Sequence, residues 1–212
     1  MYVGRIVAVG NTRDNKLTAM YRVSSRSFPN RQSVQNGEII AIVPKEGFEK
    51  DIFRNPYITY NCLRINRRYA VAANGTQTDP IIEKLETGMS TRDALVSVLF
   101  SLDYEHDHLK TPRIVAVIDI ETRTGLLAIV RSDSLLVRTF TPKPGEAFYV
   151  ATYEQDYPDD KFHDDNFHVN NAPEACDYIL GKGVFANLEL PVSAACAIES
   201  AVGFQIANKN IK

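Results

Sequence analysis

Nine short segments with alternating polar and apolar residues, rich in β-branched and aromatic side chains, run through most of the chain. Turn pairs such as Asn36-Gly37 and Asn74-Gly75 separate them. Because the strands occur in runs with few helices set apart from them, the pattern predicts an α+β fold of two antiparallel sheets packed together and flanked by helices. The expected strands are residues 2–9, 17–24, 38–43, 58–65, 69–73, 114–118, 125–130, 135–140 and 147–153.

A helix is expected after Ser90, whose side chain can cap the first free amides. Asp93 lies three residues further on, which is a variant of the capping box. One face of the following segment is apolar, and Val96 and Phe100 make the opposite side apolar as well. Such a helix should be covered on both sides.

The C-terminal part predicts two more helices. Pro173 suits a first helical position, and Gly181 suits the end of the same helix. Pro191 is expected to open the last helix, which lies in the most apolar long stretch, residues 191–207. Polar residues interrupt this stretch and it falls short of roughly 20 apolar residues, so it predicts a buried helix and no membrane span.

Composition and charge limit the kinds of partner. The chain has 212 residues, 44% of them hydrophobic, which is enough for a substantial core, and a net charge of −2 gives no field that attracts nucleic acid or an anionic membrane. Without an internal repeat or a flexible linker, we expect a single domain over residues 1–212. The start lacks the pattern of a secretory signal, and the three cysteines suit a reduced compartment, so a cytoplasmic location is expected.

An arginine-rich segment is the first candidate for binding. Residues 21–31 leave a strand and enter a loop with three arginines and three serines. Guanidinium groups can hold a phosphate or carboxylate in two places, and hydroxyls and loop amides can complete the shell. The alternative is a solvated loop with structural salt bridges.

A second candidate lies at the entry of a strand, in residues 53–62, where aromatic rings and amides are concentrated. Alternation places Tyr60 and Cys62 on one side of this strand and Asn61 on the other. A strand tyrosine is usually a packing residue, so a catalytic role for Tyr60 stays one of two alternatives. The turn Asn74-Gly75 has polar atoms that could face a ligand.

The third candidate is the segment where the apolar helix ends. Glu105 lies there, near the negative end of the helix dipole, and burial would favour its neutral form. Both effects raise the pKa of a carboxyl group, which suits a proton shuttle.

Two groups of histidines raise the question of a metal site. His106 and His108 lie among acidic residues, and so do His163 and His168. Neither group has the spacing of a helical zinc motif, and the acidic segment around His163 is most simply a hydrated loop. A P-loop, a G-x-G-x-x-G motif and a serine nucleophile elbow are also missing, so what is left is an anion site with phenols, amides and one carboxyl group.

Taken together, these segments resemble the archaeal-type IMP cyclohydrolases of purine biosynthesis. The likeness runs over about 150 residues in a fixed order, and Arg-Val-Ser-Ser-Arg-Ser-Phe-Pro-Asn-Arg together with Arg-Asn-Pro-Tyr makes it specific. The part from about Asp156 matches less clearly. The segments that carry the resemblance are Tyr2 to Ile6, Tyr21 to Arg31, Phe53 to Cys62, Asn74-Gly75 with Thr78-Asp79, Asp103 to Glu105 through Thr111-Pro112-Arg113, and Thr152 to Gln155.

The resemblance implies a four-layer αββα sandwich like that of the N-terminal-nucleophile hydrolases. Their chemistry is not implied, because Met1-Tyr2 offers no amino-terminal nucleophile. The implied reaction interconverts 5-formamidoimidazole-4-carboxamide ribonucleotide with IMP and water, by acid/base and electrostatic catalysis without a metal or other cofactor. A homo-oligomer is also expected, since apolar outer helices can assemble symmetrically.

The resemblance also implies roles for single residues. Arg31 would stabilise developing negative charge, Tyr60 would exchange a proton with the reacting amide and formyl groups, and Glu105 would relay or orient that proton. Which arginine meets the phosphate stays open. The implied contacts to the nucleotide are Arg22, Arg26, Ser27, Asn61, Asn74, Tyr104, Arg113 and Tyr153.

Two other functions stay open from the sequence. One is a non-catalytic module that binds purine nucleotides, and the other is a cyclic amidohydrolase that acts on a related ribonucleotide. A phenol and a carboxyl group with a raised pKa are not needed for binding alone, which disfavours the first.

Overall fold

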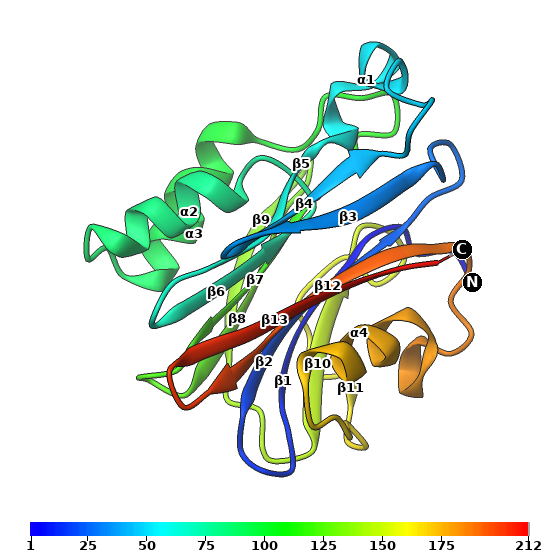
Figure 1. Cartoon of the computed structure of the whole chain (residues 1–212). Helices are drawn as coiled ribbons and strands as arrows, with labels where there is room; N and C mark the ends of the chain where they lie inside the picture. The colour runs from blue at the N-terminus through cyan, green and yellow to red at the C-terminus, as the bar shows by residue number, and fades with distance from the viewer. Residues whose placement is uncertain (212) are drawn as a thin grey trace.

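The computed structural model describes residues 1–211. In this part of the chain, two antiparallel sheets lie face to face and helices cover their outer faces (Figure 1). The predicted α+β fold, a four-layer αββα sandwich, is therefore confirmed. The likeness to the N-terminal-nucleophile hydrolases stays a prediction.

The first sheet has six strands. Its centre is formed by strands that are buried along their whole length, because both faces are covered. Ile6 pairs with Ala151 on one side and with Arg22 on the other, which aligns three strand ends. In spatial order the strands are β11 (His163–Asp164), β10 (Glu146–Ala151), β1 (Ile6–Asn11), β2 (Leu17–Ser24), β12 (Pro191–Ser200) and β13 (Gly203–Asn210).

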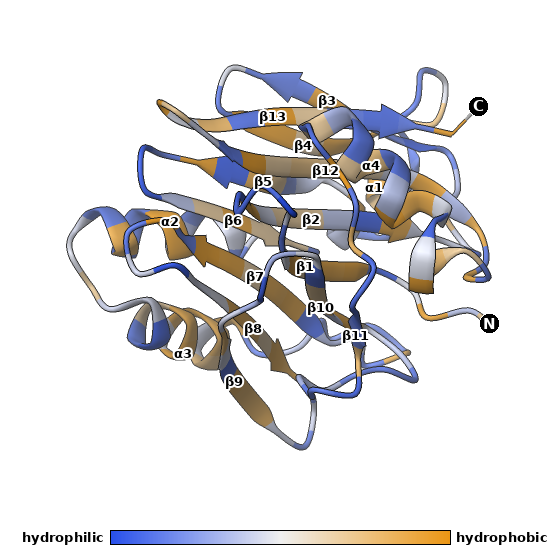
Figure 2. Ribbon diagram, turned by 90° about the horizontal axis from the view of Figure 1, so that it is seen from below, coloured by the Kyte–Doolittle hydropathy of each residue, from blue (hydrophilic) through white to orange (hydrophobic). Residues whose placement is uncertain are grey.

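The second sheet has seven strands in sequence order, so each is joined to its neighbour by a hairpin or by a connection over one face. Its first strand carries mostly polar side chains, which suits an edge, and Figure 2 colours it hydrophilic. The strands are β3 (Arg31–Asn36), β4 (Ile39–Pro44), β5 (Tyr60–Ile65), β6 (Tyr69–Ala73), β7 (Arg113–Asp119), β8 (Thr124–Val130) and β9 (Leu135–Phe140).

Three layers of apolar side chains hold the sandwich together. One lies between the sheets, one between the first sheet and helix α4 (Ala172–Gly181), and one between the second sheet and helices α2 (Thr78–Glu86) and α3 (Thr91–Leu102). Short helices α1 (Asp51–Arg54), η1 (Pro56–Ile58) and η2 (Gly183–Phe185) lie in connections. Figure 1 shows α2 and α3 on one side of the sandwich and α4 on the other.

The helix expected after Pro191 is wrong, because this residue opens strand β12. Alternate residues of β12 face the layer between the sheets and the layer under α4, so nearly the whole strand is buried. A strand with two covered faces shows no alternation, and its continuous apolar run is easily taken for a buried helix.

Helix α3 is also less covered than expected. Ser90 caps it as predicted, since its Oγ accepts a hydrogen bond from the amide of Asp93 at 3.2 Å. Ala94 and Leu95 are buried, but Phe100 is 79% exposed, because α3 belongs to the outermost layer. Helix α4 contains Pro173 in its first turn and ends at Gly181, as predicted.

Several predicted strands are longer than the real ones at the same end of the sandwich. Residues 2–5 precede β1, Pro56–Ile58 form η1 ahead of β5, and Tyr153 lies beyond the end of β10. Strands β3 and β13 and helix α2 were not expected. Within residues 1–211 we find no helix that is both long and apolar enough to cross a membrane.

Gly4 fixes the path of the chain into β1. Its φ of +72° lies in the left-handed region, and a Cβ there would be 2.1 Å from Thr152 Oγ1 and 2.8 Å from the ring of Tyr153. Only glycine lets the segment that carries Tyr2 and Arg5 run this close to the end of β10.

We expect Gly4→Ala to lower the free energy of unfolding by about 1 to 3 kcal/mol more than Gly37→Ala, because it adds steric overlap to the backbone strain. Gly37 is the matched control, since it also has a positive φ but nothing within 4 Å of its Cβ position. Urea denaturation of both variants measures the difference, and equal losses would contradict the close approach.

Candidate active site

Two neighbouring cavities that share lining residues open at the end of the sandwich where the irregular segments lie. The inner cavity has a volume of about 50 Å³ and is lined by Arg5 and Arg31 among others, and the outer cavity has about 470 Å³ and contains Arg26. The outer volume is typical of a ligand pocket, whereas the inner one holds only a few water molecules. The lining residues common to both are Tyr2, Ser27, His108, Leu109 and Tyr153.

Three buried charged groups meet at the inner cavity. Arg5 Nη2 lies 3.4 Å from Glu105 Oε2, and Arg31 contributes a second guanidinium group that is 2% exposed. Glu105 is fully buried beneath the cavity. Within residues 1–211, Arg5 Nε, Arg31 Nη1 and Glu105 Oε1 are buried without a hydrogen-bond partner. Buried polar atoms are nearly always paired, so these three indicate a place for a polar ligand.

Tyr60 lies beside this group and is joined to the opposite sheet. Its hydroxyl is 2.5 Å from the hydroxyl of Tyr21 on β2. Burial raises the pKa of Tyr60, while Arg31, Arg5 and the hydrogen bond with Tyr21 act in the other direction. A phenol under these opposing influences keeps its proton at rest and has cations nearby when it gives that proton up.

The pKa of Glu105 suits a group that carries protons. Burial raises its pKa to about 7, although Arg5, Arg113 and Arg31 lower it. The same environment acts on Arg5: burial alone lowers its pKa, but Glu105 and the nearby phenols more than reverse this. A carboxyl group with a pKa near 7 can accept and release protons at neutral pH.

A hydrogen-bonded chain leads from the wall of both cavities toward the Glu105 segment. The hydroxyl of Tyr153 is 2.9 Å from Thr111 Oγ1, which donates to Asp107 Oδ2 at 2.8 Å. The amide of Glu105 donates to the carbonyl of Thr111 at 2.8 Å, so these hydrogen bonds also fix the backbone at Glu105.

The outer cavity combines a cation with stacked aromatic rings. The guanidinium carbon of Arg26 lies 4.1 Å from the centroid of the Tyr2 ring, and Tyr2 stacks on Tyr153 with centroids 6.1 Å apart. Arg26 is largely exposed and its nearest carboxylate, on Glu189, is 4.0 Å away. Arg26 therefore has N–H groups available for an anion, and the neighbouring Ser27 lines both cavities.

The model of the family of IMP cyclohydrolase-like proteins matches residues 2–203 of this chain. The chain belongs to this family. The chain is 42% identical over 197 residues to a protein of Methanosphaera stadtmanae named IMP cyclohydrolase, covering 93% of this chain and 94% of that protein. A protein of the same name from Methanocaldococcus jannaschii is 40% identical over 210 residues, covering 99% of each. One from Methanocella arvoryzae is 49% identical over 156 residues, covering 73% and 75%.

The surroundings of Arg22 do not favour its predicted contact with the nucleotide. It is fully buried under α4, where Nε donates to Ser24 Oγ and the terminal nitrogens donate to five backbone carbonyls. Burial without a carboxylate partner lowers its pKa to about 10. All five of its N–H groups are used inside the protein, so Arg22 is left out of the proposed phosphate contacts.

Four other expected contacts lie outside the two cavities. Asn74 is fully buried, and its side chain bonds Pro112, Gln77 and Ile114. Arg113 donates to the carbonyl of Asp103 at 2.9 Å.

Asn61 and Tyr104 are also engaged with other parts of the protein. Asn61 donates to both carboxylate oxygens of Asp79 on α2. The ring of Tyr104 packs on His106 with centroids 4.4 Å apart. Apart from Arg22, the positions predicted as nucleotide contacts therefore divide into a cavity group, Arg26, Ser27 and Tyr153, and a supporting group, Asn61, Asn74, Tyr104 and Arg113.

Sequence reasoning missed four residues that line the cavities and a fifth, Tyr21, that contacts Tyr60. Arg5 belongs to a segment that carries the family resemblance, and Tyr21 begins the arginine-rich segment, but neither was predicted to have a role of its own. A single charged residue directly before a buried strand was the available signal for Arg5, because the end of a covered strand rarely carries an arginine without a partner. The missed residues are Tyr2, Arg5, Tyr21, Asp107 and Thr111.

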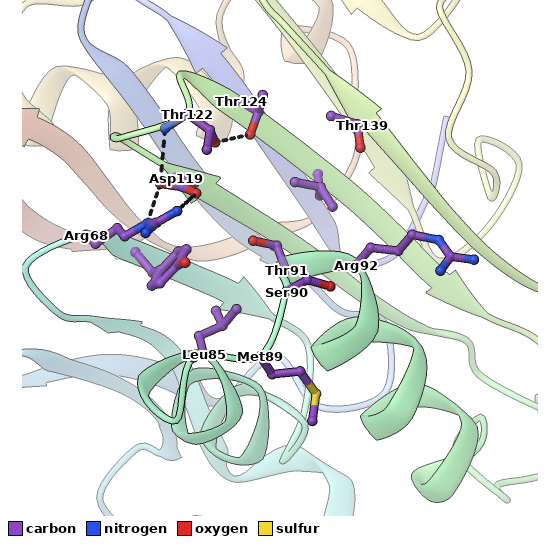
Figure 3. Close-up of a pocket in the computed structure, with 13 residues that line it drawn as sticks. Arg68, Leu85, Met89, Ser90, Thr91, Arg92, Asp119, Thr122, Thr124 and Thr139 are labelled. Atoms are coloured by element: carbon purple, nitrogen blue, oxygen red, sulfur yellow. Dashed lines mark hydrogen bonds and ion pairs between the residues drawn. The ribbon is translucent and has the colours of Figure 1, made fainter.

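A larger cavity, of about 580 Å³, lies at the opposite end of the second sheet between α2, α3 and the strands (Figure 3). Its charged groups are already paired: Arg68 donates to Asp119 at 2.8 Å and 2.7 Å, and Thr122 bonds Thr124. Satisfied groups have little reason to bind a ligand, which favours the smaller cavity as the site. Across residues 1–211, no three His, Cys, Asp or Glu side chains are grouped as metal ligands.

We expect Arg22→Lys to lower the free energy of unfolding by about 2 to 4 kcal/mol, because a lysine leaves several buried carbonyls without donors. Arg26→Ala is the matched control in the same segment, and its exposed side chain should cost less than about 0.5 kcal/mol. Urea denaturation compares them. Similar stability of the two variants would contradict the structural role of Arg22.

Proposed function

We propose that this chain is an IMP cyclohydrolase. In the reaction, the carboxamide nitrogen of 5-formamidoimidazole-4-carboxamide ribonucleotide attacks the formyl carbon and IMP forms. One hydrogen from each of the two nitrogens leaves with the formyl oxygen as water, and the reverse reaction is hydrolysis. The observation that carries the proposal is the buried group of Arg5, Arg31 and Glu105 with unpartnered polar atoms, in a chain of this family.

The outer cavity supports binding of the ribose phosphate. Arg26 and Ser27 offer donors to a phosphate, and the stacked rings of Tyr2 and Tyr153 offer an apolar wall. The reacting base would then lie toward the inner cavity, which has to widen to admit it because its present volume is about 50 Å³. This order of subsites is supported by Arg5 and Arg31, which line only the inner cavity and whose charges act on Tyr60 and Glu105.

The inner groups suit the two chemical demands of the reaction. An amide nitrogen is a weak nucleophile, and the negative charge that develops when it attacks needs cations, which Arg31 and Arg5 supply. The formyl oxygen needs a proton, which Tyr60 can donate, and Glu105 can take up the amide proton because its pKa is about 7. Holding the formyl group beside the carboxamide supplies much of the remaining acceleration, since both groups are on one ring.

Two further proposals concern the location of the protein and its assembly. The three cysteines are free and buried, which suits a cytoplasmic location. Phe100, exposed on the outer face of α3, suits a contact between copies in a homo-oligomer.

We expect Tyr60→Phe to lower kcat by about a hundredfold or more while KM changes little, because the ring stays and only the proton donor is lost. The assay incubates the purified protein with the formamido ribonucleotide and follows purine absorbance. EDTA should leave the wild-type rate unchanged. Loss of activity with EDTA, restored by zinc, would instead support the histidine groups as a metal site.

The same assay separates the alternatives. A wild-type protein that binds IMP without turnover would be a nucleotide-binding module. A wild-type protein that is inactive on this substrate but hydrolyses another cyclic ribonucleotide would be a related amidohydrolase. Either result would contradict the proposed function.

Glu105 should make stability depend on pH. Its folded pKa of about 7 lies above the ordinary value of 4.5, so the folded protein holds this proton more tightly and ionisation of Glu105 costs stability. The cost is absent below about pH 4.5 and complete above about pH 7. Glu105→Gln removes it, so the variant should gain about 3 kcal/mol relative to wild type between pH 4 and pH 8.

Urea denaturation at the two pH values measures this difference, in which pH-independent effects of the amide on Arg5 cancel. The variant should also lose turnover, together with any limb of the wild-type pH–rate profile near pH 7. A constant stability difference across this range would show that Glu105 titrates normally in the folded protein.

A further inference from the structure

The two phenols of Tyr21 and Tyr60 form a polar contact inside the apolar layer between the sheets. Tyr21 lies on β2 and Tyr60 begins β5, and their rings meet edge to face with centroids 6.3 Å apart. Their hydroxyls are 2.5 Å apart, and in residues 1–211 this is the only hydrogen bond that either hydroxyl makes. The contact therefore joins the catalytic candidate on one sheet to a residue of the other sheet.

Only one of the two phenolic protons can lie between the oxygens. If Tyr60 donates, the proton of Tyr21 points into the apolar layer, where a buried O–H group without an acceptor is costly. Tyr21 is fully buried, whereas Tyr60 is 5% exposed and adjoins the charged group. Donation by Tyr21 is therefore the arrangement with the lower free energy, and it leaves the proton of Tyr60 free.

The surrounding charges favour the same direction. Arg31 and Arg5 both stabilise the ionised form of Tyr60. Burial, followed by the neighbouring Tyr60, raises the pKa of Tyr21 well above its ordinary value, so Tyr21 keeps its proton. When one phenol of a pair becomes negative, it accepts the hydrogen bond from the other, and here that phenol is Tyr60.

We propose that Tyr21 is a positioning residue of the reaction: its hydroxyl donates to the oxygen of Tyr60, directs the Tyr60 proton to the substrate, and stabilises the phenolate left behind. The inference rests on the proposed function. In that step the O–H bond of Tyr60 breaks and an O–H bond forms on the formyl oxygen. The electron pair stays on Tyr60, which later regains a proton that originates from the attacking nitrogen.

The first test is Tyr21→Phe, which keeps the ring in the layer between the sheets. We expect kcat to fall about tenfold to a hundredfold, as for loss of a hydrogen bond to a charged group, with KM nearly unchanged. The limb of the pH–rate profile that belongs to Tyr60 should move to higher pH, because its phenolate has lost a donor. A purely structural role of Tyr21 would not move this limb.

The second test needs no change of shape. Incorporation of 3-fluorotyrosine at position 21 makes the donor phenol more acidic, so the same limb should move to lower pH and turnover should be kept. If Tyr21→Phe does not fold, this variant still tests whether Tyr21 donates to Tyr60. A limb that stays in place when the donor is strengthened would overturn the proposal.

The third test asks whether Tyr21 acts through Tyr60. In the Tyr60→Phe background, adding Tyr21→Phe should change kcat less than twofold, since the partner oxygen is gone. Tyr178→Phe is the matched control: Tyr178 is a buried phenol that donates to Asp164 on the far side of the first sheet, and its loss should leave kcat unchanged.

The outcomes separate this inference from the proposed function. An inactive wild type would overturn both. An active wild type with normal kcat in Tyr21→Phe, or with equal losses from Tyr21→Phe in both backgrounds, would overturn only the role of Tyr21.

Discussion

Two buried guanidinium groups and only one buried carboxyl group meet beneath the inner cavity, and this imbalance is the constraint on which the site depends. Arg5 is paired with Glu105 at 3.4 Å, but Arg31 forms no ion pair with a carboxylate of residues 1–211. Because burial raises the pKa of Glu105 to about 7, this carboxyl group is only partly ionised at neutral pH. Uncompensated buried charge is costly in the free protein. A developing anion supplies what is missing, which is how a preorganised site stabilises a transition state.

The antiparallel sandwich explains why these groups meet. The start of β1, the end of β2 and the end of β10 lie at one end of the first sheet, and the starts of β3, β5 and β7 lie at the matching end of the second. Side chains from distant parts of the sequence therefore converge without a long loop. The opposite end of the second sheet also has a cavity, but Arg68 and Asp119 are paired with each other there. What distinguishes the two ends is the hydrogen bonding of their buried groups.

Most strands were predictable, because β-branched and aromatic residues bounded by turn pairs mark a strand even where both faces are covered, as in β1, β2 and β7. The failure at Pro191 had a different cause: β12 is also covered on both faces, but its apolar run consists largely of small residues, which suit a buried helix equally well. The site was predictable only in part. Alternation places Tyr21 and Arg22 on opposite faces of β2, but the sequence does not say which face meets the other sheet. In the structure, Tyr21 faces the other sheet and contacts Tyr60, whereas Arg22 faces α4 and donates to backbone carbonyls. The tyrosine of the arginine-rich segment therefore lies closer to the catalytic candidates than Arg22 does, although the sequence favours the arginine.

Two residues of the supporting group, Asn74 and Arg113, hold the backbone of the segment that carries Glu105. The segment that carries Glu105 begins at Asp103, whose φ of 56° is rare for a residue with a side chain. Arg113 donates to the carbonyl of this residue, and Asn74 donates to the carbonyl of Pro112 at the other end of the segment. Strain of this kind persists only where the surroundings hold the backbone in place. We therefore propose that Asn74 and Arg113 act one step away from the substrate, by fixing the backbone from which the carboxyl group of Glu105 reaches Arg5.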